Sequence, residues 1–184
     1  MLHDLTLGLS TTGKTTLQQQ VARRLQNGGR QTAILDPLYV GGASAWGHPA
    51  FITGDRNAFL RWARSNQSAD LFVDESGISV DRYDPRFDWL TTTSRHLGHR
   101  AHFIAHRLTA LSPTTRVQCQ NLFLFRCNVQ DARALADEYG CPGLTAAASL
   151  PRYEFLNVAP CDPMRKGRIV RGALGRFRLE LNAA

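Results

Sequence analysis

The sequence lacks the cysteine pattern of disulfide-stapled or zinc-binding proteins. Its 184 residues include four cysteines, none in a C-x-x-C pair and none at zinc spacing from a histidine. We therefore expect reduced thiols, with Cys119 and Cys127 in or near the core. The histidines at 96, 99 and 102 do not indicate a metal site, because they cross a helix end and a strand and no carboxylate or cysteine lies among them.

Long hydrophobic runs are also missing. No apolar run approaches the roughly 20 residues that a membrane-spanning helix needs. Asp4 interrupts the N-terminus where a signal peptide would be apolar. No internal repeat or low-complexity segment is present. We expect a cytoplasmic protein with no membrane partner.

Acidic side chains are outnumbered by basic ones. Lysine and arginine total 22 against 15 aspartates and glutamates, which gives a net charge of +7. Most of the excess is arginine, whose forked guanidinium suits phosphate, so a nucleic-acid partner is one interpretation and simple solubility is the other. The apolar share of 43% and the charged share of 20% indicate an ordinary globular protein.

The most specific feature is the run GLSTTGKT at residues 8–15, which fits G-x-x-x-x-G-K-[ST] at every fixed position. Residues 5–7 (LTL) predict a short buried strand before it, and residues 16–27 predict a helix after it. A strand, a tight loop and a helix N-terminus form a phosphate cradle. Lys14 would reach the β- and γ-phosphates, and the Thr15 hydroxyl would hold Mg²⁺. The remaining cradle residues are Gly8, Ser10, Thr11, Thr12, Gly13 and Thr16.

A second acidic site follows another apolar strand, at residues 71–73. Asp74 would hold the metal ion, and Glu75 would activate the attacking water. The alternative is a helix cap or a surface pair of acids. His106 ends the strand predicted at 101–105, where a polar side chain would sense the γ-phosphate. The alternative for His106 is a surface histidine without such a role.

Three arginines, Arg95, Arg107 and Arg116, are expected near the same sheet edge. Each is a candidate arginine finger that reaches the nucleotide of a neighbouring subunit. For any one of them the alternative is a solvated charge.

Strand and helix patterns alternate through the first 140 residues. This favours an α/β fold with a mainly parallel, five-stranded central sheet flanked by helices. Residues 1–143 would form the core, and residues 144–184 a small β-rich extension packed on the same domain. The expected strands are 5–7, 31–35, 71–73, 101–105 and 122–125, then 153–158, 168–171 and 177–181. The expected helices are 16–27, 57–65 capped by Asp55, 87–97, 113–119 and 129–139. Residues 38–54 and 76–85 are expected to be irregular, and 166–167 to form a turn.

Several motifs occur in an order that resembles the FtsK–HerA superfamily of DNA-pumping ATPases. The resemblance covers about residues 5–140, and the compact size is most similar to viral and phage genome-packaging ATPases. The motifs are Asp36-Pro37 after the second strand, SRHLG at 94–98, His106-Arg107 where the family usually has Gln-Arg, Arg116 before LFLFR, and Asp131-Ala132-Arg133.

This resemblance implies a RecA-like (ASCE) P-loop NTPase that hydrolyses ATP with Mg²⁺. It implies translocation of double-stranded DNA into a capsid by a homo-oligomeric ring, with the finger from Arg95, Arg107 or Arg116 acting in trans. Capsid or portal-vertex proteins would be further partners. The location would be the host cytoplasm, with the virion as an additional place.

Three rival interpretations stay open at this point. A nucleotide or small-molecule kinase would use Asp36 as its base. A GTPase switch would use residues 74–77 as D-x-x-G and residues 128–131 as an echo of N-K-x-D, although Val129 replaces the lysine that packs on guanine. A DNA-binding scaffold with a degenerate P-loop is disfavoured, because Lys14, Thr15, Asp74 and Glu75 are intact.

Overall fold

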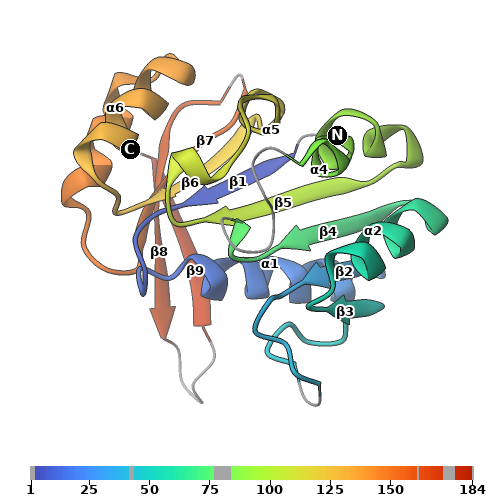
Figure 1. The fold of residues 1–184 in the computed structure, drawn as a ribbon. Coiled ribbons are helices and arrows are strands. Elements are labelled where there is room, and N and C mark those ends of the chain that lie inside the picture. Colours follow the sequence, from blue (N-terminus) through green and yellow to red (C-terminus); the bar gives the residue numbers. More distant parts are fainter. Residues whose placement is uncertain (1–2, 42–43, 77–83, 161, 172–176, 184) are drawn as a thin grey trace.

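A computed structural model of the chain describes residues 3–41, 44–76, 84–160, 162–171 and 177–183. These residues form one continuous nine-stranded sheet in the order β3-β2-β4-β5-β1-β6-β7-β8-β9 (Figure 1). The strands are β1 (Asp4–Leu7), β2 (Gln31–Leu35), β3 (Phe51–Thr53), β4 (Ala69–Val73), β5 (Arg100–Ala105), β6 (Asn121–Phe125), β7 (Glu154–Val158), β8 (Arg165–Arg171) and β9 (Phe177–Ala183).

The sheet has a parallel part and an antiparallel part. The six strands from β3 to β6 are parallel neighbours, whereas β7, β8 and β9 follow as antiparallel ones. The helices are α1 (Lys14–Asn27), α2 (Arg56–Ser65), α4 (Pro85–Thr92), α5 (Pro113–Gln118) and α6 (Val129–Glu138), with 3-10 turns η1 (Ser94–Leu97), η2 (Leu108–Ala110) and η3 (Pro142–Ser149). All six parallel strands end at one edge, which is where ligands bind in open α/β sheets.

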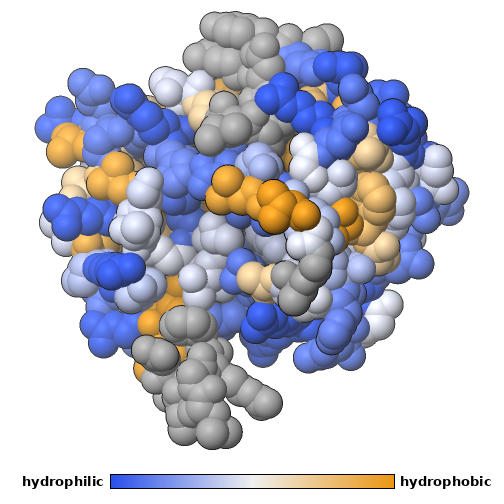
Figure 2. Space-filling model, turned by 60° about the horizontal axis from the view of Figure 1, so that its bottom comes forward, coloured by the Kyte–Doolittle hydropathy of each residue, from blue (hydrophilic) through white to orange (hydrophobic). Residues whose placement is uncertain are grey.

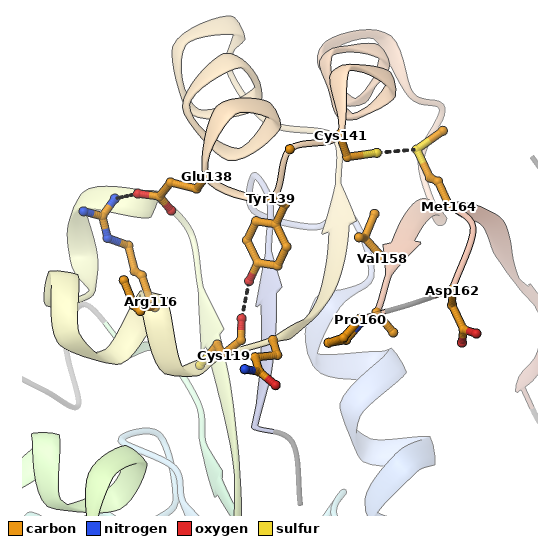
Figure 3. A pocket seen from close by; sticks show the side chains of 13 residues that line it. Arg116, Cys119, Glu138, Tyr139, Cys141, Val158, Pro160, Asp162 and Met164 are labelled. Atoms are coloured by element: carbon orange, nitrogen blue, oxygen red, sulfur yellow. Dashed lines mark hydrogen bonds and ion pairs between the residues drawn. The ribbon is translucent and has the colours of Figure 1, made fainter.

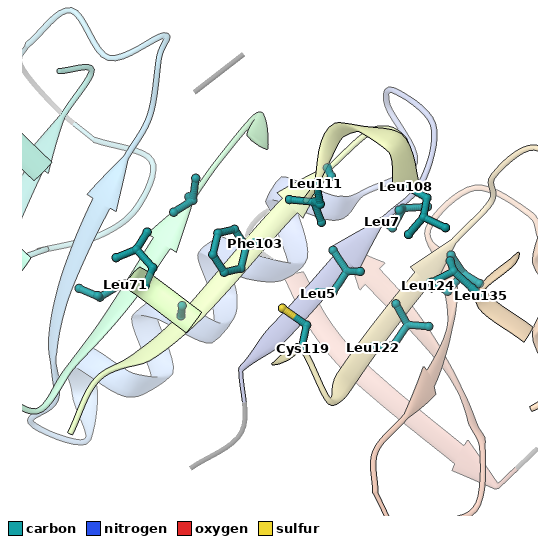
Figure 4. Close-up of a cluster of buried hydrophobic side chains, with 14 of the residues drawn as sticks. Leu5, Leu7, Leu71, Phe103, Leu108, Leu111, Cys119, Leu122, Leu124 and Leu135 are labelled. Atoms are coloured by element: carbon teal, nitrogen blue, oxygen red, sulfur yellow. The ribbon is translucent and has the colours of Figure 1, made fainter. Parts of the chain in front are cut away.

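Alternate residues of the buried strands face opposite sides of the sheet, and each side has its own core. On one side Leu5, Phe103 and Leu122 pack with residues of α2, α4 and α6 (Figure 4). On the other side α1 covers the sheet, and Ile34 and Phe125 belong to two smaller clusters there. The helix α1 therefore holds the loop before it firmly against the end of β1.

The predicted fold class is confirmed, including the five expected core strands and the antiparallel strands that follow them. Asp55 caps α2 as expected, because its side chain accepts hydrogen bonds from the backbone of Asn57 and Ala58. Cys119 and Cys127 are buried, whereas Cys161 lies outside the described residues. The division after residue 143 stays a prediction; β6 pairs with β7 across it, so the sheet is continuous.

Several element boundaries differ from the prediction. The first helix begins at Lys14 rather than residue 16, so the phosphate-loop lysine is already helical. Residues 38–54 contain a sixth parallel strand, β3, which is too short for a sequence pattern. Helix 87–97 divides into α4 and η1. Of the expected loop at 76–85, residues 77–83 lie outside the described part.

The turn predicted at Lys166 and Gly167 is wrong. Both residues lie inside β8, paired with β7 on one side and β9 on the other. A side chain at Gly167 would clash with the ring of Phe155, so the glycine serves close packing between neighbouring strands rather than a turn.

Hydrophobic side chains on the face shown in Figure 2 form separate areas among hydrophilic ones. Among the described residues, the large apolar side chains that are exposed are scattered along the chain, at Leu9, Leu38, Val40, Val117, Val129 and Leu181. Among the described residues no helix combines the length and the apolar character that a bilayer crossing requires.

Candidate active site

The phosphate-loop motif connects β1 to α1 in a tight turn. Thr11 has a φ of 62° and Gly13 a φ of 115°, both in the left-handed region. A side chain at Gly13 would come within 2.9 Å of Tyr153 Cδ1 and 3.0 Å of Ile169 Cδ1, so only glycine fits. No side chain caps the N-terminus of α1, which leaves its first backbone N–H groups to face a ligand.

Lys14 is almost completely buried at the start of α1. Its Nζ donates to the Leu9 carbonyl at 2.9 Å and to His106 Nδ1 at 3.1 Å. Burial lowers the pKa of Lys14, and the carboxylates of Glu75 and Asp74 oppose that shift. The amine is therefore held by two neutral acceptors that an anionic ligand would replace.

Asp74 follows β4 directly and is buried. The Thr15 hydroxyl donates to Asp74 Oδ1 at 3.3 Å, and the Glu75 backbone N–H donates to the same oxygen at 3.0 Å. Burial raises the pKa of Asp74 to about 6, and the nearby charges of Asp36 and Glu75 add to the rise. The predicted pair of metal-binding residues, Thr15 and Asp74, is thus in contact.

These two side chains fit a magnesium ion. A hydroxyl and a carboxylate are hard oxygen ligands, and a divalent cation would offset the burial and the nearby negative charges that raise the pKa of Asp74. No group of three or more His, Cys, Asp or Glu side chains in the described part of the chain is arranged to hold a metal. Magnesium at nucleotides typically uses only one or two protein carboxylates, with phosphate oxygens completing its shell.

Glu75 and His106 form the other half of the site. His106 Nε2 lies 2.7 Å from Glu75 Oε1 and 2.6 Å from Oε2. Because Lys14 donates to Nδ1 of the same ring, we assign the proton to Nε2, so that His106 is neutral and donates to Glu75. The backbone of Glu75 has a φ of 49°, in the left-handed region that few residues other than glycine adopt.

The strand order explains why these side chains meet. β5 lies between β1 and β4 in the sheet. Lys14 follows the loop after β1, Glu75 follows β4, and His106 follows β5, so the histidine stands between the other two. The result is a continuous chain of contacts from Lys14 through His106 to Glu75. Thr15 and Asp74, the sequence neighbours of its two end residues, form a second contact beside it.

A pocket of about 370 Å³ opens at this edge. It is lined by Ser10, Thr11, Gly13, Lys14, Thr15, Thr16, Glu75, His106, Arg152 and Tyr153. Gly8 does not line it; a side chain there would lie 2.7 Å from Phe125 Cβ. Thr12 is buried, and its hydroxyl donates to the Leu9 carbonyl at 2.8 Å.

Arg152 and Tyr153 are the pocket residues that sequence reasoning missed. They stand just before β7, in the extension, and Arg152 Nε donates to the Thr11 carbonyl at 2.8 Å. No motif marks them, because the contact joins positions 141 residues apart and depends on how β7 folds back beside β6.

The three finger candidates do not lie at one edge as expected. Arg107 follows β5 and is exposed at the edge that carries the pocket. Arg95 in η1 and Arg116 in α5 precede β5 and β6, which places them at the opposite edge. Arg116 is paired there with Glu138 at 2.8 Å. None of the three lines the pocket beside the phosphate loop.

A second pocket, of about 550 Å³, lies at that opposite edge between α5, α6 and the ends of β7 and β8 (Figure 3). The Arg116–Glu138 pair lines it, together with Tyr139, whose hydroxyl donates to the Cys119 carbonyl at 2.5 Å. It shares no lining residue with the pocket beside the phosphate loop.

The residues on which the rival interpretations depend have structural partners. Asp36 accepts from the Leu38 backbone at 2.9 Å and from Trp46 Nε1 at 3.1 Å. Asn128 caps α6 by accepting from the Asp131 backbone at 2.7 Å, and its amide donates to the Asp131 carboxylate at 2.9 Å. Residue 77, the glycine of the D-x-x-G match, lies outside the described residues.

No family model and no curated protein matches the sequence. Solved structures do match the fold. The genome packaging NTPase B204 from Sulfolobus turreted icosahedral virus 2, solved with AMPPCP, matches with a TM-score of 0.73 and 17% identity over 89% of this chain and 95% of that one.

Two further solved structures also match the fold. The conjugation coupling protein TcpA of pCW3, solved with ATPγS, has a TM-score of 0.66 and 15% identity, covering 88% of this chain and 58% of TcpA. VirB4 of Thermoanaerobacter pseudethanolicus has a TM-score of 0.62 and 11% identity, with 87% of each chain covered. The expected RecA-like fold is thus shared with these solved structures.

Proposed function

We propose that this protein is a Mg²⁺-dependent ATPase that moves double-stranded DNA, and that it packages a viral or phage genome into a capsid. The contacts at the strand ends support the ATPase part of this proposal. The DNA part is supported by the likeness in fold, over 89% of this chain and 95% of the matching one, to a genome packaging NTPase.

The observation that carries the proposal is the chain of contacts from Lys14 through His106 to Glu75. It connects an amine positioned for phosphate to a carboxylate positioned for water through a single imidazole. Phosphate transfer to water needs the amine and the carboxylate to be positioned together around the same phosphate. A phosphate that draws Lys14 away would free Nδ1 of His106, so the histidine would report the state of the γ-phosphate to Glu75.

The remaining residues have matching roles in the proposed reaction. The backbone N–H groups of the phosphate loop and of α1 hold the phosphate oxygens. Thr15 and Asp74 would hold Mg²⁺, which neutralises phosphate charge when bound. Glu75 orients the attacking water and takes its proton. His106 fixes the direction of the Glu75 carboxylate.

Assembly into a homo-oligomeric ring belongs to the same proposal. Arg107 is exposed at the edge that carries the pocket, and Arg95 is exposed at the opposite one. An arginine from a neighbouring subunit would complete the site, as in other P-loop enzymes. A basic chain with a net charge of +7 suits contact with DNA phosphates. Capsid or portal-vertex proteins would be its partners in the host cytoplasm or the virion.

Turnover of ATP and GTP, with and without double-stranded DNA, tests this function. The full chain is compared with Glu75→Gln and with Asp137→Asn, a matched change at an exposed position of α6. We expect ATP hydrolysis that DNA stimulates, that Glu75→Gln abolishes and that Asp137→Asn leaves unchanged. Turnover of GTP but not of ATP would favour a GTPase switch. Turnover that requires a small phosphate acceptor and does not respond to DNA would favour a kinase.

A further inference from the structure

The segment before β7 crosses the outside of the phosphate loop and is tied to it at two points. The Tyr153 backbone N–H donates to the Thr12 carbonyl at 3.0 Å. Arg152 Nε donates to the Thr11 carbonyl at 2.8 Å. The extension therefore forms one wall of the pocket, on the side of the phosphate loop that Glu75 and His106 do not occupy.

Tyr153 is held in an unfavourable backbone conformation at this wall. Its φ is 67°, which costs a tyrosine free energy unless surrounding contacts enforce it. The Ile169 backbone N–H donates to its carbonyl at 2.9 Å, and its ring packs against Gly13. These contacts fix the direction of the ring, with one side against the loop.

Arg152 covers the ring of Tyr153. Its guanidinium carbon lies 4.6 Å from the ring centroid, and the side chain is exposed. A single nitrogen, Nε, makes the bond to Thr11, which holds the guanidinium in place at the pocket wall. Among the described residues Arg152 is the one arginine that lines this pocket.

We propose that Arg152 and Tyr153 bind the nucleoside end of the nucleotide, with the base stacked on the guanidinium plane that the tyrosine supports. This inference rests on the proposed nucleotide binding. The phosphates have their own partners in Lys14 and the loop backbone, which leaves the flat cationic surface for the base. Guanidinium planes and aromatic rings stack with bases of any kind, so the pair adds affinity without choosing between adenine and guanine.

The alternative role for Arg152 is to bind phosphate through its charge. The two roles differ in which ligand they affect. A stacking residue contributes to ATP and GTP but not to inorganic tripolyphosphate, whereas a phosphate-binding residue contributes to all three. Replacement by lysine separates them further, because lysine keeps the charge and loses the plane.

Calorimetric titration of the full chain with ATP, GTP and tripolyphosphate, each with Mg²⁺, tests the proposal. Arg152→Ala and Arg152→Lys should each weaken ATP and GTP binding about tenfold and change tripolyphosphate affinity less than twofold. Arg133→Ala, at an exposed position of α6, is the matched control and should bind all three ligands like wild type.

If Arg152→Ala weakened tripolyphosphate binding as much as ATP binding, the stacking role would be overturned. If Arg152→Ala left ATP binding unchanged, the role of Arg152 would be structural only. A wild-type chain that binds ATP no more tightly than tripolyphosphate would overturn the inference while leaving the phosphate site in place. A wild-type chain that binds none of the three ligands would overturn the proposed function itself.

Discussion

His102 lies within β5 and His106 directly follows it, four residues further on. Both histidines contact carboxylates, but one contact is buried and the other is partly exposed. His106 contacts Glu75 at the edge of the sheet, where their side chains are 37% and 23% exposed. His102 lies between Asp4 and Asp70, where none of the three side chains exceeds 2% exposure. The same pair of chemical groups is therefore open to ligand and water in one place and sealed in the other.

The buried cluster is held together by ion pairs among its own side chains. His102 Nδ1 lies 2.7 Å from Asp4 and Nε2 3.0 Å from Asp70, so both ring nitrogens face carboxylates. Arg100 and Arg30 pair with the same two aspartates, at 2.6 and 2.8 Å. The ring also stacks on Phe72, 4.2 Å between centroids. The open cluster instead leaves its groups facing a pocket, and this difference separates a structural network from a candidate site.

Removal of His102 should have the largest effect on stability. His102→Ala leaves two buried carboxylates without their shared partner, and breaking a buried ionic contact in this way costs about 3–5 kcal/mol. Urea unfolding of wild type and variant measures the loss. His106→Ala is the control, because a partly exposed pair contributes at most about 1 kcal/mol. Equal losses in the two variants would remove the distinction between the clusters.

Removal of His106 should instead affect catalysis. His106→Ala releases the Glu75 carboxylate, and misplacement of such a group costs about 100-fold in kcat. His106→Gln should recover much of the activity, because an amide can accept from Lys14 and donate to Glu75 at once. Steady-state ATP hydrolysis measures both variants. A glutamine variant as slow as the alanine variant would argue against this bridging role.

The phosphate loop, Asp74, Glu75 and His106 were predictable because each follows an apolar run that is typical of a strand. Strands of that kind end at a common edge, and the local pattern is sufficient to locate them. The contact between Lys14 and His106 was not predictable, because it depends on β5 lying between β1 and β4 in the sheet.

The rest of the site depends on distant parts of the chain. Arg152 and Tyr153 reach the loop only because β7 pairs beside β6 and Ile169 of β8 supports the tyrosine. The buried cluster also gave no signal, because Asp4 and Asp70 are each the single charged residue of a short strand. His102 belongs to the histidine trio whose spacing does not indicate a metal site, and its actual partners lie on neighbouring strands, β1 and β4.

The pH dependence of stability should reveal the buried cluster. Burial opposes the charged forms of all three groups, but His102 with Arg100 lowers the pKa of Asp4, and His102 with Arg30 lowers that of Asp70. The two aspartates outweigh burial and the repulsion from Arg100, and raise the pKa of His102. His3, the other histidine near the cluster, has its pKa lowered by burial and accepts from the Ala101 backbone.

The sign of each contribution follows from these directions. The aspartates stabilise the fold above their ordinary pKa of 3.8 and lose that contribution as the pH falls through their lower folded values. His102 stabilises it fully below 6.5 and loses that contribution as the pH rises through its raised folded pKa. A tenfold difference in proton affinity between the folded and the unfolded chain corresponds to about 1.4 kcal/mol. The difference in unfolding free energy between wild type and His102→Gln should therefore shrink from pH 6 to pH 9; a difference that grows would contradict a charged His102.

Arg30 should contribute least, because it reaches the cluster from the solvent side. Its Nε donates to Asp70 at 2.8 Å, but its side chain is 32% exposed, so water replaces much of what a substitution removes. Arg30→Gln should cost about 0.2–1 kcal/mol in urea unfolding, the range of solvent-exposed ion pairs. Addition of salt should shrink that cost, because salt screens exposed charges much more than buried ones. A loss as large as that of His102→Ala would instead mean that the ionic network responds as one unit, so that exposure at its rim does not protect it.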